Sequence, residues 1–155
     1  MLDNILPRHI DNTFRGQKPA LWFFGAMVFM KTTQSLAVLF GGPSVISSAD
    51  GIPLDTYVPA AAQTVVSLWA LLGLTRFWIC LLCVLVLVRY RSMVPFMFAL
   101  LLLHDLGRSL VLHFLPIIRT GTPPGPLVNQ AILVMTMVGL VLSLWTKRNP
   151  PLQSA

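Results

Sequence analysis

The chain has 155 residues, of which 55% are hydrophobic and only 10% carry a formal charge. A soluble domain needs about a quarter charged residues to cover its surface, so the composition excludes a water-soluble globule and a disordered tail. The net charge of +6 does not indicate a nucleic-acid-binding domain, because the cations stand at the ends of apolar segments or inside them. The composition predicts an integral membrane protein that forms a single transmembrane domain over residues 1–155.

Four apolar stretches are long enough to cross a bilayer as helices, which takes about 20 residues. They run from about 21 to 40, 60 to 88, 95 to 116 and 128 to 145. Pro19, Pro59 and Pro95 stand at or just before predicted helix starts, where a missing N–H leaves no hydrogen bond unmade. We therefore expect an all-α, integral membrane four-helix bundle. The connection from Gly41 to Pro59 is the one long enough for a small external structure.

The lysines and arginines in the short connections predict the orientation. One side of the bundle carries seven of them, namely Arg8, Arg15, Lys18, Arg89, Arg91, Lys147 and Arg148. The other side carries Arg119, together with Asp50 and Asp55, so we expect both termini to be cytoplasmic. A signal peptide cleaved near Ser47 and Ala49 is the alternative, but the first apolar stretch is longer than the about 7–15 residues typical of such peptides.

Three cations lie inside the predicted spans, namely Lys31, Arg76 and Arg108, and they are accompanied by one acid, Asp105, and by His104. With a rise of ~1.5 Å per residue, each group lies ~14–20 Å from the cytoplasmic end of its span, near the bilayer midplane. A Lys, Arg or Asp at that depth costs about 2.5–3.5 kcal/mol on the insertion scale. We therefore expect these side chains to face the bundle interior and to pair with one another.

Helical spacing extends this predicted polar core. Gln34 follows Lys31 by three residues, and His104 and Arg108 are four apart, so each pair lies on one helix face. The core then comprises Lys31, Gln34, Arg76, His104, Asp105 and Arg108.

One aspartate cannot neutralise three cations, and two interpretations follow. In the first, the core is an internal network that fixes helix packing. In the second, either Lys31 is deprotonated by burial or another anion belongs there. That anion is a lipid headgroup, an anionic or quinone-like ligand, or an acidic residue of a partner subunit.

The remaining chemistry-bearing residues predict no catalytic, cofactor or metal site. Cys80 and Cys83 form a C-x-x-C inside an apolar span, where burial opposes thiolate formation, so we expect two core-filling thiols. His104 and His113 are nine residues apart and thus on opposite faces of one helix, which prevents them from ligating one haem iron.

Short motifs resemble those of the DoxX-like superfamily of small four-helix bacterial membrane proteins. They cover about half of the chain and comprise Ala60-Ala61-Ala62-Gln63, Leu71-Leu72-Gly73-Leu74-Thr75-Arg76, Gly107-Arg108, Pro116 and Gly121-Thr122-Pro123. Gln63 stands where the family often has Glu. The resemblance implies an accessory membrane subunit, of a kind linked to quinone-reactive oxidoreductase complexes, and recurring positions for Arg76 and Arg108.

Together these features predict a non-enzymatic accessory or binding subunit of the bacterial inner (plasma) membrane. Its expected partners are the lipid bilayer, a membrane protein or a second copy of itself, and an anionic lipid or quinone-like ligand, but not nucleic acid. A small carrier for an anionic or amphipathic molecule is the alternative, followed by the membrane subunit of a quinone-linked oxidoreductase. The sequence identifies neither the ligand nor the partner.

Overall fold

The computed structural model describes residues 5, 11–14 and 16–145. Four of the predicted orienting cations, Arg8, Arg15, Lys147 and Arg148, lie outside these residues. The described part is helical and without strands. Four long helices are α2 (Lys18–Phe40), α4 (Pro59–Arg89), α5 (Val94–Phe114) and α6 (Pro124–Leu144), with the shorter α3 (Gly42–Asp50) and two 3-10 turns, η1 (Leu54–Thr56) and η2 (Arg91–Met93).

The four long helices are long and apolar enough to cross a membrane, which confirms the predicted all-α class and the number of spans. Their bounds differ from the predicted ones by a few residues, and α2 begins at Lys18 rather than near 21. Helix α6 begins at Pro124 rather than near 128, because prolines in a first turn give up N–H groups that have no intrahelical acceptor. Helix α5 ends at Phe114, before Pro116, because a residue preceding proline is disfavoured in helical conformation.

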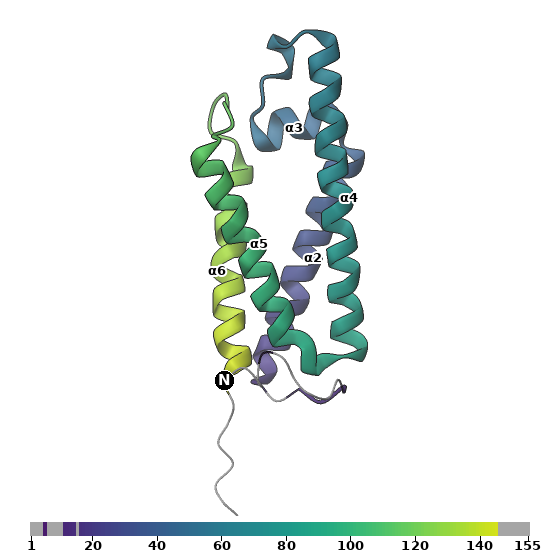
Figure 1. Ribbon diagram of the computed structural model, residues 1–155, viewed down its shortest axis with the longest axis vertical. Helices are drawn as coiled ribbons and strands as arrows, with labels where there is room; N and C mark the ends of the chain where they lie inside the picture. The colour runs from purple at the N-terminus through teal and green to yellow at the C-terminus, as the bar shows by residue number, and fades with distance from the viewer. Residues whose placement is uncertain (1–4, 6–10, 15, 146–155) are drawn as a thin grey trace, which may run out of the picture.

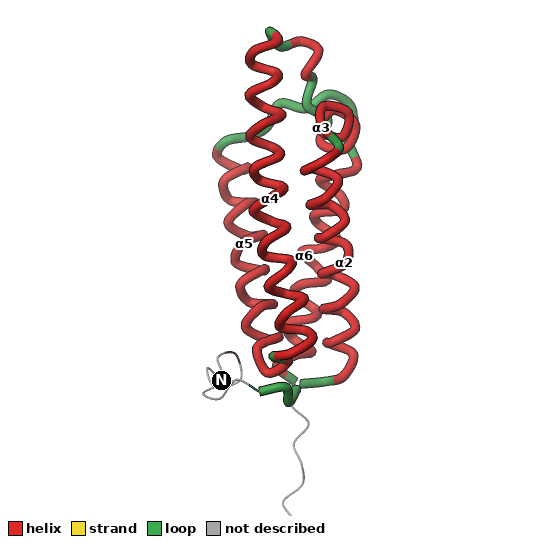
Figure 2. Tube along the Cα trace, turned by 90° about the vertical axis from the view of Figure 1, so that its right-hand side faces the viewer, coloured by secondary structure: helices red, strands yellow, loops and turns green. Residues whose placement is uncertain are grey.

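The long helices form an elongated bundle (Figures 1 and 2). Helix α2 packs against α4 on one side and α6 on the other, and α5 packs against α6. The turn η2 joins α4 to α5 at the end where α2 begins and α6 ends, which we call the η2 end. At the opposite end, the α3 end, α4 and α5 lie apart (Figure 1). The described cations of the predicted cytoplasmic side, Lys18, Arg89 and Arg91, belong to the η2 end.

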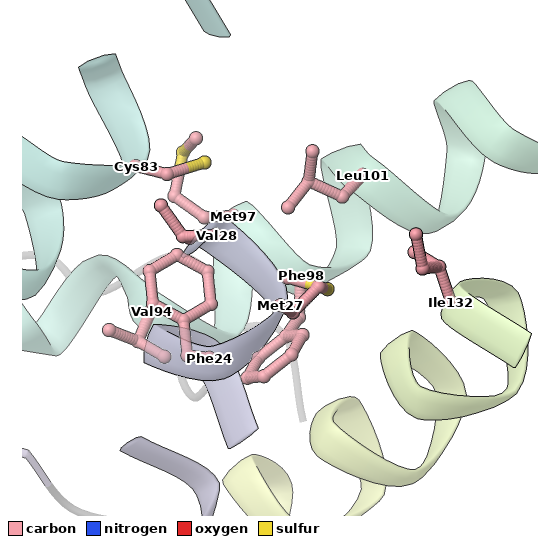
Figure 3. Packing of buried hydrophobic residues seen from close by; sticks show 9 residues of the cluster. All are labelled: Phe24, Met27, Val28, Cys83, Val94, Met97, Phe98, Leu101 and Ile132. Carbon is pink, nitrogen blue, oxygen red and sulfur yellow. The ribbon is translucent and has the colours of Figure 1, made fainter. Parts of the chain in front are cut away.

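The apolar core lies toward the η2 end, where the helices converge. Its buried side chains come from all four long helices and comprise Phe24, Met27, Val28, Cys83, Val94, Met97, Phe98, Leu101 and Ile132 (Figure 3). The rings of Phe24 and Phe98 meet edge to face, with centroids 5.0 Å apart. Cys80 and Cys83 are free and buried, as expected of core-filling thiols.

The outer faces of the bundle are apolar. Trp22 is 82% exposed and Phe29 73% exposed, and large hydrophobic side chains line the outside of every long helix. In water such a surface would drive association, whereas lipid tails are as apolar as these side chains. The exposed surface is thus that of a small multi-pass membrane protein.

A small folded structure closes the α3 end, as the length of the connection from 41 to 59 predicted. Helix α3 ends at Asp50 and is capped by Gly51, whose φ of +72° is the left-handed conformation that glycine adopts without strain. The carbonyl of Gly51 then accepts hydrogen bonds from the Thr120 backbone N–H at 2.8 Å and from its hydroxyl at 3.2 Å. The connection between α5 and α6 is therefore held against α3.

Candidate functional site

The structure brings together all six residues of the predicted polar core. They line one cavity of about 30 Å³, to which α6 adds Asn129 and α4 adds Cys80. The six come from three helices: Lys31 and Gln34 from α2, Arg76 from α4, and His104, Asp105 and Arg108 from α5. A volume of this size holds a water molecule or two, so this core cavity cannot itself hold a larger ligand.

An ion pair joins α2 to α5 across the core. The Lys31 ammonium lies 2.9 Å from each carboxylate oxygen of Asp105, and the two side chains are only 16% and 13% exposed. His104 Nδ1 lies 3.3 Å from Oδ1 of the same carboxylate. The carboxylate of Asp105 therefore pairs with Lys31 and supplies its countercharge.

Arg76 and Arg108 differ from Lys31, because neither forms a salt bridge or a side-chain hydrogen bond with any residue that the structure describes. Arg108 lies in the electrostatic field of Arg76, Asp50, Asp105 and Arg119. Asp50 accepts a hydrogen bond from Trp69 Nε1 at 2.9 Å rather than pairing with an arginine. The polar core thus has three cations against one carboxylate, and with the neighbouring Arg119 and Asp50 the count is four against two.

A larger cavity lies between α4 and α5 toward the α3 end, where these helices diverge (Figure 1). It has a volume of about 550 Å³, within the range of ~300–1,000 Å³ typical of small-molecule sites. Arg76, His104 and Arg108 line it together with Asp50, Trp69 and Thr75, and the rest of the wall consists of Val38, Leu72, Gly107, Val111, Leu112 and Ile117. We call it the apolar cavity, because most of its exposed surface is apolar.

A third cavity lies between α5 and α6 and has a volume of about 360 Å³. Its wall is richer in polar groups and includes Arg108, Ser109, His113, Arg119, Asn129 and Gln130. We call it the polar cavity. Arg108 lines the core, apolar and polar cavities alike, and is therefore the residue at which they meet.

Several polar residues of these walls were missed by the sequence reasoning, among them Asn129, Gln130 and Arg119. Asn129 and Gln130 are amides in an otherwise apolar fourth span, and the cost of such groups in lipid could have marked them. Arg119 was counted only for orientation. Nothing in its local sequence indicates that the connection folds back, because that depends on Thr120 binding Gly51.

The described residues offer no group of three or more His, Cys, Asp or Glu that could hold a metal ion. His104 lines the core and apolar cavities, whereas His113 lines the polar cavity. The two histidines thus face different spaces, as their spacing of nine residues predicted.

Comparison with protein-family models, with curated proteins and with solved structures finds no match for this chain. The resemblance to the DoxX-like superfamily therefore stays a prediction based on short motifs. The geometry of the polar core and of the cavities around it remains as the basis for inferring function.

Proposed function

We propose that this chain is a non-enzymatic binding subunit of a bacterial inner membrane that holds an amphipathic anion in the apolar cavity. The observation that carries the proposal is that Arg76 and Arg108 form no ion pair beside a cavity whose exposed surface is mostly apolar. Asp50 also lines this cavity, but its carboxylate accepts a hydrogen bond from Trp69 and pairs with neither arginine. A charged side chain inside a membrane protein is costly and by default marks a functional site. An anionic headgroup would supply the missing countercharge.

The chemistry of the wall favours an amphiphile over a small hydrophilic ion. A guanidinium binds a carboxylate or phosphate through two parallel hydrogen bonds. Side chains such as Leu72, Val111 and Ile117 bury an attached hydrocarbon chain, which contributes about 0.8 kcal/mol per CH₂ removed from water. A neutral quinone-like headgroup could accept hydrogen bonds from the arginines but would leave the excess positive charge in place.

A purely structural network explains only part of the core. The Lys31–Asp105 pair joins two helices and serves that role. Arg76 and Arg108 make no such bond between described helices, so a packing role does not account for retaining them.

The position of the cavities favours a binding subunit over a carrier. The apolar and polar cavities lie on the α3 side of the core, whereas the buried apolar cluster fills the bundle toward the η2 end. A carrier needs access from both sides in turn. The excess of lysine and arginine at the η2 end supports an orientation in which that end is cytoplasmic, and the cavities then lie in the outer half of the bilayer.

The experiment uses palmitate as the anionic amphiphile and hexadecanol as its neutral counterpart. Each is added to the protein in nanodiscs of zwitterionic lipid, and the thermal unfolding midpoint is measured. We expect palmitate to raise the midpoint and hexadecanol to leave it unchanged. Losing a hydrogen bond to a charged group costs about 1.5–3 kcal/mol, so Arg76→Gln and Arg108→Gln should each weaken palmitate binding by about tenfold or more.

The matched control is Arg89→Gln, which removes an exposed cation from the last turn of the same helix as Arg76. It should bind palmitate as the wild type does. Equal binding of palmitate by wild type, Arg76→Gln and Arg108→Gln, or equal stabilisation by hexadecanol, would refute the proposal.

A further inference from the structure

A second ligand site is indicated on the other side of α5. We infer that the polar cavity binds a phosphate group, held by Arg108 and Arg119. The inference goes beyond the proposed function, because it concerns another cavity and a hydrophilic ligand chemistry.

The wall of the polar cavity is rich in hydrogen-bond donors. Two guanidiniums, two side-chain amides, a hydroxyl and an imidazole line it, contributed by Arg108, Arg119, Asn129, Gln130, Ser109 and His113. Among the described residues, Asp105 is the one carboxylate that lines it, and both of its oxygens already bind Lys31. Such a set of donors suits a ligand that offers several acceptor oxygens and negative charge.

Arg119 supplies a second, independent observation. Its Nε is buried and has no hydrogen-bond partner in the part of the chain that the structure describes. A buried donor on a charged group is costly to leave unsatisfied, so an acceptor that reaches this guanidinium would be bound favourably. The arginine is held in position, because the next residue, Thr120, donates two hydrogen bonds to the Gly51 carbonyl.

Phosphate fits this arrangement better than a simple carboxylate does. Two guanidiniums on different elements need four acceptor positions for bidentate binding, and a phosphate group presents at least three acceptor oxygens. Arg119 follows the end of α5 at Phe114, so its side of the cavity lies toward the end of the span, whereas Arg108 lies deeper in the bundle. Free inorganic phosphate and a phospholipid headgroup share the chemistry that this site would recognise.

Arg108 connects the two sites, since it lines both the polar and the apolar cavity. One guanidinium cannot give its full set of donors to two anions. Phosphate and the amphipathic anion should therefore weaken each other's binding, and linkage requires the same factor in both directions.

The test titrates inorganic phosphate into the full chain in phosphate-free maltoside micelles, with sodium chloride at matched ionic strength as the reference. Binding is followed by the thermal unfolding midpoint and by ³¹P line broadening. We expect Arg119→Gln to weaken phosphate binding by about tenfold or more, and Arg119→Lys to weaken it too, because lysine keeps the charge but loses the planar fork.

The matched control is Arg76→Gln, since Arg76 lines the core and apolar cavities but not the polar one. This variant should bind phosphate normally while losing palmitate, and Arg119→Gln should show the reverse. The failure of this inference and the failure of the proposed function are therefore separate outcomes.

A second arm replaces inorganic phosphate with dioleoyl phosphatidic acid in the same micelles. One outcome is that only the lipid stabilises the wild type, while Arg119→Gln and Arg119→Lys are folded by circular dichroism but are not stabilised. The phosphate group that the site recognises is then a lipid headgroup. If neither probe stabilises the wild type more than it stabilises the two Arg119 variants, the polar cavity is not a phosphate site.

Discussion

The pairing of Lys31 with Asp105 makes a prediction whose size follows from the structure. Asp105→Asn removes the carboxylate and leaves an ammonium that is only 16% exposed, between two helices and without its countercharge. Breaking a buried ion pair by removing one partner costs about 3–5 kcal/mol. We therefore expect the unfolding equilibrium constant to rise by at least about a hundredfold, at 1.4 kcal/mol per factor of ten.

Removing both partners should cost far less. In Lys31→Met/Asp105→Leu no charge remains to be neutralised, and replacement of a buried pair by apolar side chains is often neutral or stabilising by about 1–4 kcal/mol. The assay is reversible unfolding in mixed micelles of maltoside and sodium dodecyl sulfate, followed by far-ultraviolet circular dichroism. Asp55→Asn is the matched control, because that carboxylate is exposed in η1 and should change the free energy of unfolding by less than about 0.5 kcal/mol.

Two results would refute this reasoning. One is an Asp105→Asn variant whose free energy of unfolding lies within about 1 kcal/mol of the wild type, since the loss expected for a buried pair is larger. The other is a double variant whose loss equals the sum of the two single losses, which would mean that the two side chains are not coupled.

Two further predictions concern packing and orientation. Gly139→Ala should destabilise the bundle by about 1–3 kcal/mol, because the added Cβ would clash with the buried ring of Phe98. Gly107→Ala is the control, because a Cβ added there meets no atom within 4 Å. Equal losses of stability in the same unfolding assay would contradict the packing described here. If the η2 end is cytoplasmic, Asp55→Cys should react with an impermeant maleimide in intact cells, whereas Arg91→Cys should react only after permeabilisation. The reverse pattern would overturn that orientation.

The features that the sequence predicts correctly depend on local rules. A run of about 20 apolar residues must form a helix in lipid because no water satisfies its backbone, and this condition locates all four spans. The fixed rise per residue then places Lys31, Arg76 and Asp105 at one depth without any knowledge of which helices touch. Their meeting in one cavity follows from that depth and from the cost of exposing charge to lipid.

The features that the sequence leaves open depend on tertiary contacts. The position of Arg119 is set by a hydrogen bond between Thr120 and Gly51, two residues that are 69 positions apart. The apolar cavity exists because α4 and α5 diverge after η2, and no periodicity within either helix encodes that divergence. The sequence likewise leaves open which cation pairs with Asp105. Arg76 and Arg108 were as well placed along their helices as Lys31, and the tertiary packing selects Lys31.

The central claim is that Arg76 and Arg108 are kept for a ligand rather than for packing, and the free energy of unfolding of the ligand-free protein tests it most directly. The measurement compares wild type with Arg76→Met and Arg108→Met in lipid-free micelles, with and without palmitate. We predict that the free energy of unfolding of both variants equals or exceeds that of the ligand-free wild type, since each loses an unpaired, half-buried charge. We also predict that palmitate no longer stabilises them. A loss of about 3 kcal/mol or more in the ligand-free variants, as for a broken buried pair, would instead show that the arginines hold the bundle together.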